Sequence, residues 1–424
     1  MIRPLRRLVL VTAALLLSDV AARTAPAPPA THPGPQFTAI ASPASGASAE
    51  PNLATGPDGR VWLSWIEQLS GGARALRAAR LENDHWGTPI EVVSGDSLLG
   101  ISVDVPALLP MGGDRLVALY LWKFPGEGHA RDVRLIQSSD GGATWSKPVT
   151  ANRDRTPTEH GFASLAADSL GPRAFWLDGR NSAVTDKAGK RTVLEEGIAD
   201  MVVRSAVLTR DGRLTDEREI DPRACDCCPT AAASGPSGAL IAYRDRSPGE
   251  IRDISVVRVG RDAAATPRTV HADGWKIQGC PVNGPAVSAS RDRVAVAWYT
   301  APRDTGRVLA AFSDDGGGTF GAPVRVDEGA PIGRAAIAVL ADGGAIVAWL
   351  ESGDDKVRLL ARRIGRSGRP STVSTVAIPG NGRGSGGIPR MTRSGAHVYL
   401  AWTEPGQLSR IRTAVTLAEY STTR

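Results

Sequence analysis

The chain has 424 residues, of which 47 are Gly, 30 are Pro, 5% are aromatic, 42% are hydrophobic and 22% are charged. So many turn-forming residues exclude a protein of long helices, and this apolar content excludes an intrinsically disordered chain. The formal net charge is +6, but the first 22 residues hold three arginines and one aspartate, so +2 of it lies there and +4 remains. Because no basic run accompanies this small charge, a nucleic-acid partner is excluded.

Residues 1–22 have the pattern of a signal peptide. Arginines at positions 3, 6 and 7 precede the apolar stretch LVLVTAALLL, which is too short to span a bilayer, and Val20-Ala21-Ala22 provides a cleavage site. No other apolar stretch of membrane length follows, so we expect an exported protein, periplasmic or secreted, without a transmembrane segment. Residues 23–35 predict a Pro-rich linker, and residues 36–424 predict a single domain that we expect to be monomeric.

A short β-favouring segment that ends in an aromatic residue recurs seven times, at intervals of 51 to 67 residues. Each copy follows a turn rich in Gly, Asp, Ser or Pro, with one apolar strand before it and one or two after it. This period predicts an all-β fold, a β-propeller of four-stranded antiparallel blades. Seven copies indicate seven blades, with six as the alternative, and residues 36–42 are expected to complete the last blade and close the ring. The repeated aromatic residues are Trp65, Tyr120, Trp176, Tyr243, Trp298, Trp349 and Trp402.

Two of the repeats carry a sharper turn motif. Residues 138–145 (SSDGGATW) and 313–320 (SDDGGGTF) both fit the pattern S-x-D-x-G-x-T-[WF]. The pattern resembles the Asp-box of the sialidase (neuraminidase) and BNR-repeat propellers. We expect Asp140 and Asp315 to accept hydrogen bonds from turn amides, which is a structural role.

The loops that lead into each blade should share one rim with the loops between second and third strands. Several arginines fall in these loops, and converging guanidinium groups would recognise the carboxylate of an anionic small molecule or glycan. The alternative is that the segment RDRSPGEIRD (residues 244–253) satisfies its own charges. The predicted ligand-binding residues are Arg180, Arg244, Arg246, Arg334, Arg390, His160, Trp275 and Asn283.

The resemblance to sialidases implies an arginine triad, a tyrosine nucleophile activated by a glutamate, and an aspartate acid/base. The candidates here are Tyr299, Glu159 and Asp178, which would make the protein a glycoside hydrolase of the exo-sialidase type. The usual N-terminal Arg-Ile-Pro signature is absent, since the first unit reads AEPNLATG instead. Catalysis therefore stays open beside ligand binding.

All four cysteines of the chain fall in the entry loops of two neighbouring units: Cys225, Cys227 and Cys228 in one, Cys280 in the next. In an exported protein this favours disulfides, with Cys280 joined to the CDCC cluster. The alternatives are a thiolate site for Cu or Zn, or a redox-active pair.

Three functions follow from these patterns. The first is an exported sialidase-like propeller with a rim pocket for an anionic ligand, which requires no cofactor. The second is a periplasmic metal or redox-linked protein built around the cysteine cluster. The third is a non-catalytic scaffold in an envelope complex.

Overall fold

The computed structural model describes residues 32–124, 128–185, 191–194, 200–236, 238–260, 266–381 and 387–418. The predicted signal peptide and most of the predicted linker lie outside these residues. The end of the linker packs on the domain, because the Thr372 amide donates to the His32 carbonyl and the Gly34 amide donates to Thr372 Oγ1. None of the described helices is long and apolar enough to cross a membrane.

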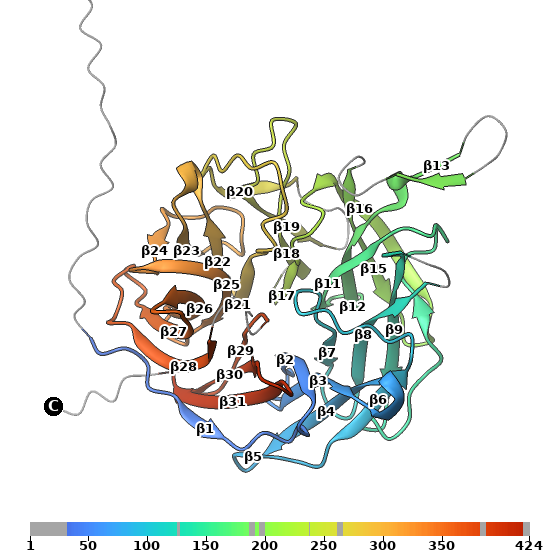
Figure 1. The fold of residues 1–424 in the computed structure, drawn as a ribbon, viewed down its shortest axis with the longest axis horizontal. Coiled ribbons are helices and arrows are strands. Elements are labelled where there is room, and N and C mark those ends of the chain that lie inside the picture. The colour runs from blue at the N-terminus through green and yellow to red at the C-terminus, as the bar shows by residue number, and fades with distance from the viewer. Residues whose placement is uncertain are drawn as a thin grey trace, which may run out of the picture.

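Seven antiparallel sheets surround a central axis, which confirms the predicted seven-bladed propeller (Figure 1). The first three blades are β2 (Ser48–Thr55), β3 (Val61–Gln68) and β4 (Arg74–Glu82) with β5 (His85–Trp86) and β6 (Ile90–Gly95); β7 (Ala107–Pro110), β8 (Leu116–Lys123), β9 (Arg131–Ser138) and β10 (Val149–Thr150); and β11 (His160–Asp168), β12 (Gly171–Asp178), β15 (Met201–Leu208) and β16 (Leu214–Ala224).

The remaining four blades follow the same order from the axis outward. They are β17 (Ala231–Gly235), β18 (Gly238–Arg244), β19 (Ile254–Val259) and β20 (Arg268–His271); β21 (Ala286–Ser290), β22 (Arg293–Thr300), β23 (Arg307–Ser313) and β24 (Val324–Arg325); β25 (Ala330–Val339), β26 (Ala345–Gly353), β27 (Lys356–Ile364) and β28 (Ser374–Asn381); and β29 (Arg390–Ser394), β30 (His397–Glu404), β31 (Arg410–Leu417) and β1 (Thr38–Ile40).

A few short elements lie outside the blades. The β13 (Ala183–Thr185) and β14 (Arg191–Val193) hairpin projects outward from the periphery of the ring in Figure 1. In the described part of the chain, single-turn 3₁₀ helices occupy residues 70–72, 180–182 and 302–304.

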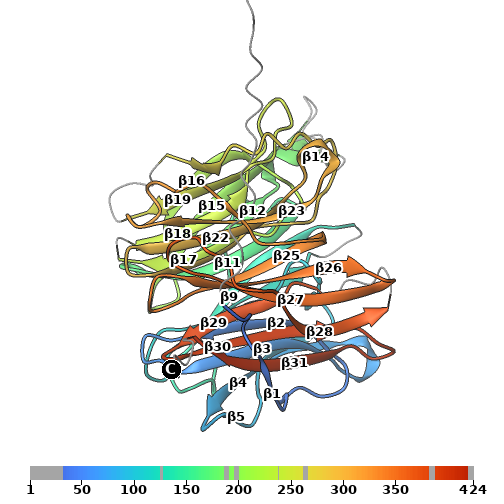
Figure 2. The ribbon, with the colours of Figure 1, turned by 90° about the vertical axis from the view of Figure 1, so that its left-hand side faces the viewer.

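The N-terminal strand closes the ring, as the sequence predicted. Strand β1 pairs antiparallel with β31, with Thr38, Ala39 and Ile40 opposite Val415, Ala414 and Thr413. Figures 1 and 2 show the two ends of the domain lying side by side in the last blade. The pairing removes the open edge that a three-stranded last blade would present.

The repeated aromatic residues build the core between blades. Trp65, Trp176, Trp298 and Trp349 are fully buried, so each indole N–H needs an acceptor inside the protein. In three of them the acceptor is a carboxylate two residues later: Glu67 at 3.4 Å, Asp178 at 2.8 Å and Glu351 at 3.1 Å. Trp298 is followed by Thr300 at this position and uses Asp273 instead, at 2.7 Å. The acidic residues two positions after these tryptophans therefore have a structural role, because they accept the hydrogen bond of the buried indole.

The two Ser-x-Asp turns have the predicted structural role. One carboxylate oxygen of Asp140 accepts from the Thr144 amide at 2.9 Å and from the Ser138 hydroxyl at 2.7 Å. Asp315 accepts equivalent hydrogen bonds from the amide of Thr319 and the hydroxyl of Ser313. These bonds, with those of the threonine hydroxyls, hold the pKa of both carboxyl groups below the usual value, to about 2 for Asp140.

Removing β1 tests the closure of the ring. We expect deletion of residues 23–42 to lower the melting temperature by about 5 °C or more, because it unpairs β31 and exposes a sheet edge. Deletion of residues 23–31 alone is the matched control and should leave the melting temperature unchanged. Differential scanning calorimetry makes the comparison, and equal melting temperatures for the two deletions would contradict the closing role of β1.

Candidate functional site

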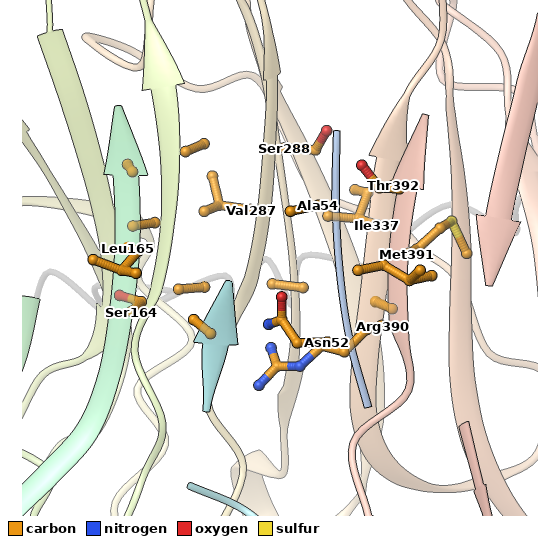
Figure 3. Close-up of a pocket in the computed structure, with 18 of the residues that line it drawn as sticks. Asn52, Ala54, Ser164, Leu165, Val287, Ser288, Ile337, Arg390, Met391 and Thr392 are labelled. Atoms are coloured by element: carbon orange, nitrogen blue, oxygen red, sulfur yellow. The ribbon is translucent and has the colours of Figure 1, made fainter. Parts of the chain in front are cut away.

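A central channel of about 400 Å³ runs between the innermost strands of the seven blades (Figure 3). Its wall consists mostly of small side chains of β2, β7, β11, β17, β21, β25 and β29, because seven strands converge on the axis. Serine and threonine side chains are spread along the wall, and Asn52 and Arg390 point into one end of the channel. We call this end, where the chain enters the inner strands, the channel mouth.

Backbone irregularities mark the channel mouth in three blades. The pairing of first and second strands shifts register between Ala49 and Asn52, and likewise in β11 and β25. At the equivalent position of each shift lies a non-glycine residue with positive φ: Glu50 at 60°, Phe162 at 50° and Arg334 at 53°. Such bulges redirect side chains, and strained backbone concentrates at functional sites. Because strained residues recur at the same place in three blades, this rim is a candidate functional site.

Two of the five predicted arginines make no side-chain hydrogen bond or ion pair with the described residues. Nη1 of Arg334 and Nε of Arg390 are buried and hydrogen-bond to nothing among the described residues. Both line one small cavity with Asn283, whose Oδ1 accepts from the Arg334 amide at 2.8 Å. Desolvation lowers the pKa of Arg334, and it lowers that of Arg390 to about 10 although Asp104 opposes the shift.

The other three predicted arginines hydrogen-bond to acceptors of the protein, although Nη1 of Arg246 is buried without a hydrogen bond among the described residues. The Arg244 guanidinium donates to the backbone carbonyls of Asn283, Arg252 and Tyr299 at 2.6 to 2.8 Å. Arg180 binds Asp178 through two nitrogens, at 2.7 and 2.8 Å. Arg246 donates to both carboxylate oxygens of Glu250. The self-satisfied alternative therefore describes the segment 244–253 better than a ligand site does.

Two carboxyl groups at the mouth were not predicted as site residues. Burial raises the pKa of Glu50 to about 7, opposed by Arg74 and supported by Asp104. Its Oε2 is buried without a hydrogen-bond partner in the described part of the chain. Asp104 is buried 3.4 Å from Arg131, and burial raises its pKa too. The signal in the sequence was their position in the blade-entry segments AEPNL and SVDVP.

The predicted catalytic carboxylates belong to a buried network in the third blade. Both oxygens of Asp178 accept from Arg180, and one also accepts from the Trp176 indole. His160 is fully buried, with Nε2 3.3 Å from Asp154 and 3.6 Å from Asp178. Burial lowers the pKa of His160, but the two carboxylates outweigh it and raise the pKa overall. The three groups lie close enough to hold a metal ion, but Arg180 already pairs with both aspartates, at 3.8 Å from Asp154 and 2.7 Å from Asp178.

Tyr299 lies apart from those carboxylates, in the fifth blade. It is half-buried, and its ring meets that of Trp275 edge-on at 5.6 Å between centroids. Burial raises the pKa of its hydroxyl, and within the described residues no carboxylate hydrogen-bonds to that hydroxyl. Glu159, the expected activating group, lies at the entry to the third blade and pairs with Arg131 of the second. The structure does not bring the three predicted catalytic residues together.

The cysteines do meet, as the topology predicted. A disulfide joins Cys227 to Cys280 and links the entry loops of the fourth and fifth blades. Cys225 and Cys228 are free thiols buried beside it. A site with four thiolate ligands for Cu or Zn cannot coexist with this disulfide, because the bond takes two of the four sulfur atoms. Within the segment CDCC, Cys225 and Cys228 have the spacing C-x-x-C, which the sequence prediction did not consider.

The raised pKa of Glu50 makes the folding stability of the protein depend on pH. A carboxyl whose pKa is about 7 when folded and 4.5 when unfolded keeps its proton longer in the folded state. Folding stability therefore falls as the pH rises from about 4.5 to 7 through this group. We expect Glu50→Gln to unfold like the wild type near pH 4.5 and to be more stable than it at pH 8. Urea unfolding at both pH values measures the difference, and an equal effect at both would contradict the raised pKa.

Comparisons with known proteins bear on the fold alone. No family model matches the sequence, and no curated protein matches it. A NanB sialidase structure from Streptococcus pneumoniae is 12% identical with a TM-score of 0.46, over 92% of this chain and 71% of that one. Trypanosoma rangeli sialidase with the inhibitor DANA is 13% identical with a TM-score of 0.43, over 79% and 56%. A puromycin-hydrolyzing peptidase of Mycobacterium tuberculosis is 14% identical with a TM-score of 0.51, over 91% and 55%. Only the last of these three has a TM-score above 0.5, and at 14% identity it shows a similar fold and nothing more. This chain spans just over half the length of the last two proteins.

Proposed function

We propose that the protein is an exported, monomeric propeller, periplasmic or secreted, that binds a carboxylate-bearing ligand at the channel mouth. Arg334 and Arg390 are its charge partners. The observation that carries the proposal is that neither guanidinium group makes a hydrogen bond or ion pair with any described residue, and that each has a buried nitrogen. The other predicted binding arginines all donate to acceptors of the protein, although one nitrogen of Arg246 is also without a hydrogen bond.

The energetic argument concerns desolvation. Moving a cation out of water costs free energy unless an anion or several acceptors replace the water, and the lowered pKa values of Arg334 and Arg390 express this cost. A ligand carboxylate would supply the missing acceptors, and a guanidinium can bind it through two parallel hydrogen bonds. The arginines would then be stabilised by the ligand rather than by the fold.

A glycan fits the channel beyond the arginines. Asn52, Ser164, Ser288 and Thr392 line it and offer an amide and hydroxyl groups to sugar hydroxyls. Glycoside hydrolysis needs a carboxylic acid that is protonated near neutral pH. Glu50, with a pKa of about 7, meets this need better than Glu159 or Asp178, because each of those carboxylates forms an ion pair with an arginine. We therefore extend the proposal to exo-glycosidase activity with Glu50 as the general acid.

Binding of N-acetylneuraminic acid, followed by isothermal titration calorimetry, tests the proposal. Arg334→Gln and Arg390→Gln should each weaken binding about ten- to a hundredfold, as expected for the loss of charge-assisted hydrogen bonds. Arg410→Gln, at an exposed position, changes the net charge equally and should bind like the wild type. No binding of this or any simple sugar acid by the wild type would overturn the proposal. Loss of sialoside turnover in Glu50→Gln with binding retained would support the hydrolase extension, and an unchanged rate would remove it.

The stability of the ligand-free protein provides a second test. Because an unpartnered buried guanidinium destabilises the fold, Arg390→Gln should raise the melting temperature in the absence of ligand. A structural arginine predicts the opposite, as in Arg244→Gln, which removes hydrogen bonds to three carbonyls and should lower the melting temperature. A fall in the Arg390 variant would contradict the assignment of this residue to a ligand.

A further inference from the structure

Four sulfur atoms lie together where the fourth and fifth blades begin. The disulfide between Cys227 and Cys280 spans 53 residues of sequence. Sγ of Cys225 lies 3.8 Å from Sγ of Cys227 and 2.8 Å from Sγ of Cys228. The second distance is less than 1 Å longer than a disulfide bond of about 2.05 Å. A small movement therefore suffices to join the two free thiols.

We propose that these four cysteines form a thiol–disulfide exchange site. The disulfide passes from Cys227 and Cys280 to Cys225 and Cys228, and Cys280 exchanges with a thiol or disulfide carried by a partner molecule.

Two exchange steps move the bond, and both conserve atoms and electrons. The Cys225 thiolate attacks Sγ of Cys227, so a Cys225–Cys227 bond forms and Cys280 leaves as a thiolate. Cys228 then attacks Sγ of Cys225, so the Cys225–Cys228 bond forms and Cys227 leaves as a thiolate. The protons of Cys225 and Cys228 end on Cys280 and Cys227. One disulfide is broken and one is made, so this rearrangement needs no oxidant or reductant.

The surroundings make Cys225 the nucleophile of the pair. Nη1 of Arg252 lies 3.3 Å from its sulfur. Burial alone raises the pKa of the Cys225 thiol, but the hydrogen bond from Cys228, the backbone amide of Cys227 and the charges of Arg244 and Arg252 outweigh burial and lower it to about 6. Burial raises the pKa of Cys228, which keeps its proton. Of the two free thiols, Cys225 therefore ionises first, and it lies beside the disulfide.

Access from solvent is limited to one of the four sulfurs. Cys225, Cys227 and Cys228 are buried, whereas Cys280 is exposed. A partner thiol or disulfide can reach Cys280 alone, so a redox change of the buried pair has to pass through the outer pair. A surface hollow of about 570 Å³ borders Cys280, and the partner molecule can bind in it. It is lined by Asp226, Arg246, Glu250, Arg252, Gln278, Gly279 and Cys280.

A metal site fits these distances less well. Two thiolates bound tetrahedrally to one zinc ion at about 2.3 Å lie about 3.8 Å apart. Cys225 and Cys228 are 2.8 Å apart, which is too close for a shared ion, and Cys227 is already bonded to Cys280. The sulfur positions therefore favour exchange over metal binding.

The experiment begins with mature protein poised in a glutathione buffer so that most molecules carry one disulfide. Acid quenching, alkylation of free thiols and tandem mass spectrometry then identify which cysteines are joined. We expect wild-type molecules with the Cys225–Cys228 bond, and free Cys227 and Cys280, beside molecules with the Cys227–Cys280 bond. If every one-disulfide molecule carries Cys227–Cys280, the relay is refuted. Four reduced cysteines with a stoichiometric metal ion, found by elemental analysis, would also refute it.

Two serine variants separate the steps. Cys225→Ser removes the nucleophile, so alkylation of Cys280 without added reductant should be at least about tenfold slower than in the wild type. Cys228→Ser removes the second attack, so the Cys225–Cys227 bond should accumulate with Cys280 free. Circular dichroism checks that each variant folds, and the wild-type mapping decides the question if one does not. Equal alkylation of Cys280 in wild type and Cys225→Ser would overturn the proposal, whatever the outcome of the sialic acid titrations.

Discussion

Closing the ring is the constraint on which the rest of the molecule depends. A seven-bladed propeller holds its axis open only while each blade packs against two neighbours, and the last blade borrows β1 to do so. The channel mouth includes residues from both sides of the point where the ring closes. Arg390 is the first residue of the seventh blade, Glu50 lies in the first blade, and Asp104 precedes the second. Asp104 interacts electrostatically with both Glu50 and Arg390, and the first and last blades pack side by side through β2, β29 and β30.

The channel mouth and the cysteine cluster share Asn283. Its side chain holds the backbone of Arg334, its carbonyl accepts from Arg244, and its backbone amide hydrogen-bonds to Cys228. Cys280 lies three residues earlier in the same loop. The residue that positions one unpartnered arginine is therefore tethered to the proposed exchange site.

The fold was accessible from the sequence because its signals are local and repeated. The aromatic-ended strands and the turns around Asp140 and Asp315 each depend on neighbouring residues, and both were confirmed. The closing segment predicted at 36–42 was confirmed as β1, although its partner strand lies at the opposite end of the chain. The site was less accessible, because the partners of an arginine lie far along the chain. Arg244 and Arg334 look alike in sequence, yet one meets three carbonyls and the other leaves a nitrogen unpaired. The raised pKa of Glu50 likewise comes from burial, which only the assembled mouth creates.

The most direct test of the central claim is a crystal structure of the protein with N-acetylneuraminic acid at saturating concentration. The account predicts the ligand carboxylate at the channel mouth, with its oxygens within hydrogen-bond distance of the guanidinium groups of Arg334 and Arg390 and the sugar extending into the channel. A structure in which both arginines instead pair with protein acceptors, with the ligand elsewhere or absent, would contradict it.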